Sequence, residues 1–537
     1  MPDSHAFDEN GGLGAWSGLN RPIGGAEKGT ILTTAPPLAR MTRTNARVLD
    51  TWRTHRKNGV EVDELKIKSA QVIVIAIRFL FVVTTIWLLV TCSLTASPPS
   101  NTGEGPRLEL RPGERYFRVA GQPAFVLGRN PAGTSPRVYD EHFRHAAAAG
   151  ELFMRIHFTF IPPNEPAGEI DAAMLNAWDE ILDSAENHGL AVLPVLGVWA
   201  DWNDGSKKEI WHRWDNNPFN VEHGGPAKRP NELFDDTPCR KLWLKRLETF
   251  VRHWSHRRAI VGWEIFSELD LVTGATEERA VLFTERAAAV IREADPWKRP
   301  VTASQSGINE WPKLLKSNSL DFIEIHPYTD GAFGGRLDDL IISTVRERLK
   351  IYGKPVLLGE CGLDSGPPRN TLEAAPHAEV GIRHAIWASV VSGAMNGRML
   401  WWQDGYDQFE KVDLCRHYDQ AAAPAAILVR GIDFTDFVPV PCDLAVGLKG
   451  AVIGNATTRI AWFRDARCGP PDWPVQPLSG QHVTMDGLGN SWRVEFFDPT
   501  TGKPTGKSLI TVRAQRLRIP LAEFQGSIAV QLKRLDP

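Results

Sequence analysis

The sequence of 537 residues is poor in cysteine and has no marked excess of either charge. It contains six cysteines, and none of them has the spacing of a zinc or haem motif. The net charge is −3 with both signs spread along the chain, so nothing in it favours nucleic acid or an anionic membrane surface. No glycine-rich phosphate turn stands near the first predicted strand, which argues against a dinucleotide-binding sheet. We therefore expect no metal, no cofactor and no nucleic-acid partner.

Tyrosine is also scarce, with 6 residues, whereas tryptophan is frequent, with 19. Flat apolar rings with one N–H donor suit stacking on the faces of sugars, although most tryptophans fill hydrophobic cores. The hydrophobic fraction of 42% is ordinary for a globular protein. The length favours more than one domain.

The N-terminal part of the chain does not have the pattern of a folded domain. Residues 1–60 are rich in Gly, Pro, Ala, Asn and Arg without sustained periodicity, so we expect residues 1–70 to be a disordered extension or a misassigned start. An apolar run follows from Gln71, interrupted only by Arg78. It is long enough for a membrane-spanning helix, and from Arg78 onward it has the pattern of an export signal.

The same run contains "LVTC", which ends at Cys92 and resembles the lipobox of bacterial lipoproteins, with Thr91 where that motif prefers a smaller residue. Residues 71–96 are thus predicted to be a signal peptide, a lipoprotein signal or a signal anchor, followed by a linker over 97–106. Each alternative exports the rest of the chain. We expect a monomeric, secreted or envelope-anchored protein that contacts the membrane only through this segment or through a lipid on Cys92.

From about residue 125 to residue 405, short apolar runs alternate with amphipathic helical stretches. Helices are predicted over 139–149, 172–187, 240–255, 276–294 and 337–352. The eight apolar runs are "AFVLGRN", "LFMRIHF", "AVLPVLGVW", "IVGWEIFSE", "PVTASQSG", "FIEIHPY", "PVLLGECG" and "RMLWWQDG". Eight strand–helix units in about 280 residues predict an α/β protein with a (β/α)8 TIM barrel over 107–426. The active site of such a barrel lies at the C-terminal ends of its strands.

Two of these runs end in carboxylates. In "VGWEIFSELD", strand alternation places Glu264, Phe266 and Glu268 on one face and Ser267 on the other. A structural ion pair is the plain alternative for such buried acids. Glu360 follows the seventh run, across a barrel mouth from the fourth. Retaining glycosidases use two carboxyl groups about 5 Å apart, one as nucleophile and one as acid and then base.

The motifs "MRIHF", "WEIFSELD", "FIEIHPY", "PVLLGECG" and "MLWWQDG", in this order, resemble the catalytic barrel of the clan A glycoside hydrolases. They are most similar to glycoside hydrolase family 5, the cellulase and β-mannanase family. The resemblance spans about residues 107–425 and includes the loop over 217–236, which resembles that of mannanase-like members. It implies a retaining glycosidase that acts on a β-linked polysaccharide or oligosaccharide, with β-mannan as the first substrate and β-glucan as the second. A non-catalytic carbohydrate-binding or adhesion protein and a transglycosylase that remodels exopolysaccharide are the alternatives.

The resemblance also assigns roles to residues. It implies that Glu268 is the acid/base and Glu360 the nucleophile. Substrate binding is implied for Arg155 beside the nucleophile, for His326 and Tyr328 after the sixth strand, and for a sugar platform formed by Trp401 or Trp402. We read Glu264 as a buried partner for a barrel arginine.

Two further substrate-binding predictions concern residues that depart from the family or lie in loops. Ser267 stands where the family has asparagine, whose amide binds the sugar 2-hydroxyl. Trp199 ends the third strand, and Trp202 belongs to the loop over 201–236, which either adds sugar subsites or packs on itself.

Past residue 427 the pattern changes to short alternating runs, which predict a small all-β sandwich over 427–537. This domain either packs against the barrel or binds polysaccharide. Cys442 and Cys468 could pair within it, although the odd number of cysteines beyond the signal leaves at least one thiol unpaired.

Overall fold

The computed structural model describes residues 107–133, 135–158, 161–205, 212–235, 237–329, 336–363, 378–401, 416–470, 473–489 and 491–535. The N-terminal extension, the predicted membrane or export segment with Cys92, and Trp402 lie outside these ranges. Among the described helices, none combines the length and the apolar character needed to cross a bilayer.

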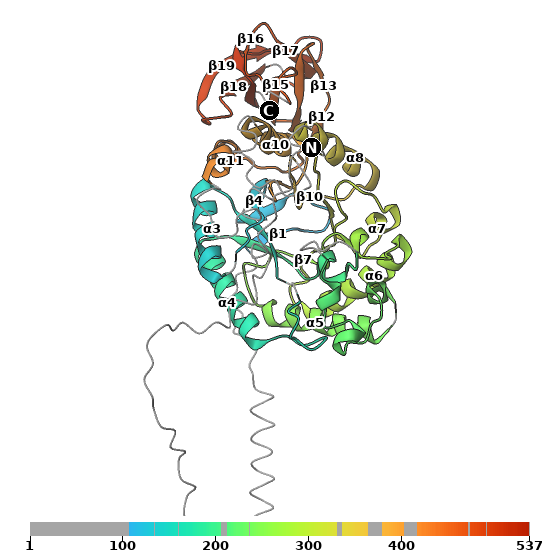
Figure 1. The fold of residues 1–537 in the computed structure, drawn as a ribbon. Coiled ribbons are helices and arrows are strands. Elements are labelled where there is room, and N and C mark those ends of the chain that lie inside the picture. The colour runs from blue at the N-terminus through green and yellow to red at the C-terminus, as the bar shows by residue number, and fades with distance from the viewer. Residues whose placement is uncertain are drawn as a thin grey trace, which may run out of the picture. The chain divides into compact units, whose positions relative to one another are not determined.

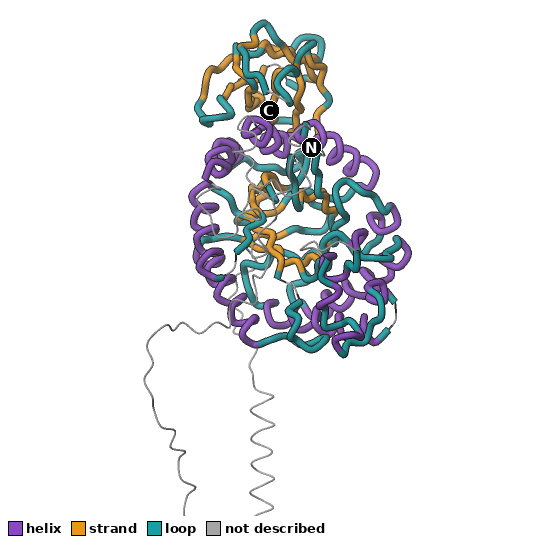
Figure 2. The backbone as a smooth tube through the Cα atoms, viewed as in Figure 1, coloured by secondary structure: helices purple, strands orange, loops and turns teal. Residues whose placement is uncertain are grey.

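Eight parallel strands form the centre of the larger part of the fold, with helices around them (Figures 1 and 2). Six of them pair in the order β11-β4-β5-β6-β7-β8, and β9 pairs with β10. Parallel bridges from Ser304 to Glu324 and from Cys361 to Leu400 join the two groups at both sides. This arrangement fits the predicted (β/α)8 barrel. The strands are β4 (Val126–Arg129), β5 (Phe153–His157), β6 (Ala191–Val195), β7 (Trp263–Glu264), β8 (Val301–Thr302), β9 (Ile323–Ile325), β10 (Val356–Leu358) and β11 (Asn396–Arg398).

The helices between the strands begin and end where local sequence signals place them. In α5, Pro238 is the first residue and the Thr237 side chain caps the N-terminus by accepting from the Arg240 N–H. Gly150 ends α3 in the left-handed conformation. The predicted helices over 172–187 and 337–352 are confirmed at both ends, and the other three at one end or within three residues. The helices are α3 (Pro136–Ala149), α4 (Ala172–Asn187), α5 (Pro238–Trp254), α6 (Glu277–Ala294), α7 (Pro312–Lys316), α8 (Leu337–Tyr352), α10 (Ala378–Ser392) and α11 (Arg416–Val429).

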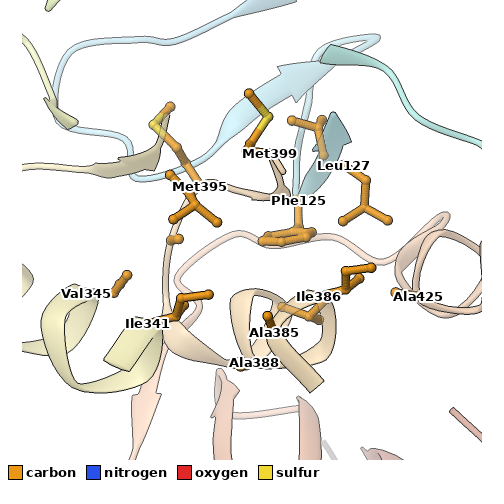
Figure 3. Packing of buried hydrophobic residues seen from close by; sticks show 14 of the residues in the cluster. Phe125, Leu127, Ile341, Val345, Ala385, Ile386, Ala388, Met395, Met399 and Ala425 are labelled. Carbon is orange, nitrogen blue, oxygen red and sulfur yellow. The ribbon is translucent and has the colours of Figure 1, made fainter. Parts of the chain in front are cut away.

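Two hydrophobic clusters fill the space between strands and helices. One packs α3 to α6 around β5 to β8. The other joins β4 and β10 to α8, α10 and α11 and includes residues of a small antiparallel sheet of β1 (Leu108–Glu109), β2 (Phe117–Val119) and β3 (Gln122–Ala124). Figure 3 shows Phe125 and Leu127 from the β4 region close to Ile386 and Ala385 of α10. Most described tryptophans are buried in the cores.

Antiparallel sheets follow the barrel, as predicted for an all-β domain. A six-stranded sheet has the order β12-β14-β15-β22-β18-β19, and a three-stranded sheet has the order β13-β17-β20. Both sheets contribute to one hydrophobic cluster, as expected for a sandwich. The strands are β12 (Val438–Val440), β13 (Cys442–Leu444), β14 (Leu448–Gly454), β15 (Thr458–Asp465), β16 (Pro477–Leu478), β17 (His482–Asp486), β18 (Ser491–Phe497), β19 (Pro504–Thr511), β20 (Arg516–Pro520), β21 (Phe524–Gln525) and β22 (Ser527–Arg534).

The β-domain packs against α8 and α10 of the barrel. Arg464 of β15 is fully buried and forms ion pairs with Asp338 and Asp339 of α8. The indole N–H of Trp387 in α10 donates to the carbonyl of Pro499 at 3.1 Å. These contacts favour the packing role over an independent binding module.

The pairing of Cys442 with Cys468 that the sequence allowed does not form, because both thiols are free. Cys442 lies on the three-stranded sheet and packs against the sandwich core. Cys468 belongs instead to the cluster shared with the barrel. The two cysteines therefore face different cores.

Candidate active site

Arg155 is the centre of a buried group of charges at the C-terminal ends of the barrel strands. It is the third residue of β5, and its guanidinium is fully buried. Its Nε and Nη2 donate to the two oxygens of Glu264 on β7, at 2.6 and 2.8 Å. The prediction that Glu264 pairs with a barrel arginine is thus met in the structure. A bidentate pair of this kind fixes the plane of the guanidinium.

The guanidinium also contacts three other side chains. Nη1 donates to Glu360 Oε1 at 2.8 Å and to Asn130 Oδ1 at 3.3 Å. Nη2 donates to the Ser267 hydroxyl at 3.0 Å. Arg155 therefore connects the end of β7 to Glu360, which lies two residues after the end of β10.

Glu360 is held from two sides. Besides Arg155, the Tyr328 hydroxyl donates to its Oε2 at 2.7 Å. Both oxygens of Glu360 thus act as hydrogen-bond acceptors. Burial raises the pKa of Tyr328 well above its ordinary value, and the charge of Glu360 adds to this shift. Tyr328 consequently stays a hydroxyl donor.

Glu268 has a different environment. Its Oε1 lies 2.9 Å from His326 Nδ1, and its side chain is about one-eighth exposed. Burial raises the pKa of Glu268, with the charge of Glu360 acting in the same direction and the hydrogen bond from His326 opposing both. The two glutamates thus differ in their hydrogen-bond partners although their side chains are identical.

The two carboxylates come close to each other around His326. One oxygen of Glu268, one oxygen of Glu360 and one nitrogen of His326 all lie within 4.8 Å of one another. Both carboxylates therefore lie beside the same imidazole ring.

The predicted alternation along "VGWEIFSELD" is wrong beyond Glu264. Phe266 packs outward against Trp243 and Phe283, whereas Ser267 points inward to Arg155, on the same side as Glu264. The physical reason is that β7 ends at Glu264. Glu268 has a left-handed backbone, with φ 58° and ψ 56°, which a residue with a side chain adopts only when its surroundings hold it there.

Within the described residues, two groups of three are compact enough for a metal ion: Glu264, Glu324 and His326, and Glu268, His326 and Glu360. The cationic guanidinium of Arg155 already contacts one or two carboxylates of each group. A second cation at this place would meet Arg155 at close range, so the geometry assigns these acids to an ion-pair network.

The predicted aromatic residues fall into different environments. Trp401 is almost buried, and its ring centroid lies 5.0 Å from that of His157. Trp199 is partly exposed, and its backbone N–H donates to the carbonyl of Ser267 at 3.2 Å. Both remain candidates for contact with a sugar.

Trp202 is predicted to bind substrate, but the structure does not place its ring at an exposed site. It is fully buried, with its ring against those of Trp214 and Phe219. In the described part of the loop over 201–236, Phe234 is buried as well. The rings in this part of the loop pack against one another. The Trp202 ring has no exposed face on which a sugar could stack.

Sequence reasoning missed two residues of the site. Asn130 accepts from Arg155 and donates to the carbonyls of Gly359 and Met399, which links β4 to β10 and β11. Glu324 of β9 lies 2.8 Å from Arg155 Nε. Its signal was present in "FIEIHPY", since Glu324 and His326 are two residues apart and share one face of a strand.

Solved structures of glycoside hydrolases, among them the following two, resemble the chain in fold. A glycoside hydrolase aligns with a TM-score of 0.54 over 80% of this chain and 98% of its own, at 13% identity. A glycoside hydrolase of family 5 from Bacteroides vulgatus aligns with a TM-score of 0.53 over 80% of this chain and 93% of its own, at 13% identity. No protein-family model matches the sequence, and no curated protein matches it. The resemblance to family 5 is confirmed at the level of the fold.

Proposed function

We propose that the protein is a retaining glycoside hydrolase that cleaves a β-linked polysaccharide or oligosaccharide by double displacement. The observation that carries this proposal is the approach of Glu268 and Glu360 to within 4.8 Å around His326. The fold shared with known glycoside hydrolases supports it.

Glu360 is the nucleophile in this proposal. Arg155 and Tyr328 donate to its two oxygens, and a carboxylate accepts such hydrogen bonds. Its attack on the anomeric carbon forms a glycosyl ester as the bond to the leaving oxygen breaks. The two donors also hold the carboxylate in one orientation before the attack.

Glu268 is the acid and then the base. Its raised pKa lets it keep a proton for the leaving oxygen, and the proton moves to that oxygen as the glycosidic bond breaks. The resulting carboxylate then takes a proton from water, whose oxygen attacks the anomeric carbon and releases Glu360. The second displacement restores the original configuration.

The substrate remains a proposal from the sequence. The loop over 217–236 resembles that of mannanase-like enzymes and supports β-mannan first, with β-glucan second. The aromatic groups proposed to contact the sugar are Trp199, Trp401 and Trp402. The apolar run over 71–96 supports an exported or envelope-anchored enzyme, and a monomer is proposed.

The direct test compares the natural protein with Glu360→Gln on a panel of β-mannans, β-glucans and xylans, measuring new reducing ends. Glu360→Gln should lose nearly all hydrolysis, whereas Glu248→Gln, on the exposed side of α5, should keep it. Proton NMR of the first product should show the β-anomer. Hydrolysis that survives Glu360→Gln, or an α-anomer released first, would contradict the proposal.

The presence of serine at position 267 favours a second candidate function, the binding of carbohydrate without catalysis. The Ser267 hydroxyl accepts from Arg155 and is almost fully buried, and the side chain is shorter than the asparagine of the family. Ser267→Asn separates the possibilities: restored hydrolysis in a weak enzyme would indicate degeneration, and lost hydrolysis would indicate adaptation. A transglycosylase would instead yield products longer than the starting oligosaccharide.

A further inference from the structure

Glu324 is a buried carboxylate that the proposed reaction does not use. It lies in the middle of β9, and its side chain is fully buried. Its Oε1 is 2.8 Å from Arg155 Nε and 3.6 Å from His326 Nε2. A residue with a side chain in place of Gly359 would overlap this carboxylate. The absence of a side chain at Gly359 therefore provides the space that the Glu324 carboxylate occupies.

His326 has carboxylates at both of its ring nitrogens. Nδ1 lies 2.9 Å from Glu268 Oε1 and 3.6 Å from Glu360 Oε2, and Nε2 faces Glu324. A neutral imidazole has one N–H and one lone pair, so it would direct the lone pair at an acid on one of the two sides. An imidazolium presents N–H groups to both sides.

The charges that face His326 favour the imidazolium. Glu264 and Glu268 are raised in pKa by burial, Glu264 to about 7, and burial holds the pKa of His157 well below its ordinary value. Burial alone would lower the pKa of His326, but Glu360, Glu268 and Glu324 together raise it to about 10. The titratable and charged groups around the ring are Arg155, His157, Glu264, Glu268, Glu324 and Glu360.

We propose that Glu324 is a positioning residue that keeps His326 doubly protonated, so that Nδ1 always donates to Glu268 and never accepts its proton. This inference rests on the proposed role of Glu268. With Nδ1–H on Oε1, the proton of Glu268 belongs on Oε2 and is available to the leaving oxygen. A neutral His326 with a free lone pair on Nδ1 would compete for that proton.

The test follows the ring nitrogens of His326 by NMR in protein labelled with ¹⁵N-histidine, with His326→Gln to assign the signals. In the natural protein both nitrogens should carry protons from pH 6 to pH 9. In Glu324→Gln the ring should titrate at least one pH unit lower than in the natural protein.

Glu264→Gln is the matched control, because Glu264 is equally buried and also pairs with Arg155, whereas the carboxylate that pairs with Nε2 of His326 is that of Glu324. It should move the titration of His326 by less than half as much as Glu324→Gln does. Glu324→Asp, which withdraws the carboxylate by one methylene, should give an intermediate value.

Three results would overturn the proposal: one unprotonated ring nitrogen in the natural protein at pH 7, an equal pKa of His326 with and without Glu324, or a larger shift in the control. The first result needs no variant, so it decides even if Glu324→Gln does not fold. The NMR titration also needs no substrate. Absence of hydrolysis would therefore refute the proposed function without obscuring the state of His326.

Discussion

Replacing Arg155 by methionine should destabilise the protein strongly at alkaline pH and only weakly at acid pH. Arg155 is the buried cation in contact with Glu264, Glu324 and Glu360. Methionine preserves much of the side-chain volume but leaves the carboxylates without this partner. Breaking a buried pair from one side costs about 3 to 5 kcal/mol.

The pH dependence follows from the carboxylates that remain. An uncompensated buried carboxylate binds a proton instead of staying charged. For a carboxyl group with an ordinary pKa of 4.5, that protonation costs about 5 kcal/mol at pH 8 and about 1 kcal/mol at pH 5. The penalty of Arg155→Met should therefore fall by about 4 kcal/mol for a group that is ionised over this whole range in the natural protein, and by less for Glu264, whose pKa burial already raises to about 7.

Urea unfolding monitored by tryptophan fluorescence at pH 5, 6.5 and 8 would measure this change. Arg252→Met is the control, since Arg252 forms an exposed pair with Glu248 on α5 and should contribute less than about 1 kcal/mol at every pH. If Arg155→Met lowered the free energy of unfolding equally at pH 5 and pH 8, the buried-charge account of the site would be refuted.

Three further predictions concern the loop, the domain contact and the alkaline stability. Trp202→Ala should lower the free energy of unfolding by about 3 to 5 kcal/mol with little change in KM, as urea unfolding and kinetics would show. Arg464→Met should cost about 3 to 5 kcal/mol because it leaves Asp338 buried without its partner, and calorimetry should show the loss in the unfolding of barrel and β-domain alike. The folded pKa of His326, about 10, lies above its ordinary 6.5, so its stabilisation is complete below pH 6.5 and is lost as the pH rises through 10. The difference in unfolding free energy between the natural protein and His326→Gln should therefore shrink over this range, by at most about 5 kcal/mol.

Much of the barrel could be predicted because its signals are local. The ends of α4 and α8 follow from helical periodicity and from residues such as Asp171, whose side chain caps α4, and Gly353, which ends α8 in the left-handed conformation. The order of strands and helices then leaves few topologies open. The same local reasoning placed Arg155, Glu268 and Glu360 at strand ends.

What the sequence could not supply are the features that depend on distant partners. Trp202 has the same local pattern whether it faces a sugar or the rings of Trp214 and Phe219, and only the packed loop decides between them. Glu324 was missed because its role is defined by residues on β5 and after β9. Cys442 and Cys468 likewise keep free thiols because they pack in two separate hydrophobic cores.

The left-handed backbone at Glu268 connects these observations. An ideal strand would have sent Ser267 away from Arg155, but the chain leaves the strand after Glu264 and brings Ser267 and Glu268 inward in succession. Ser304 secures this turn, since its hydroxyl accepts from the Glu268 N–H at 3.0 Å and donates to Glu264 at 3.1 Å. The residue that pairs with Arg155 and the residue proposed as the acid are thus joined through one side chain. A displacement of Glu264 would reach Glu268 by this route as well as through Arg155 and Glu360, so the proton affinity of the acid and the orientation of the nucleophile depend on the same buried group.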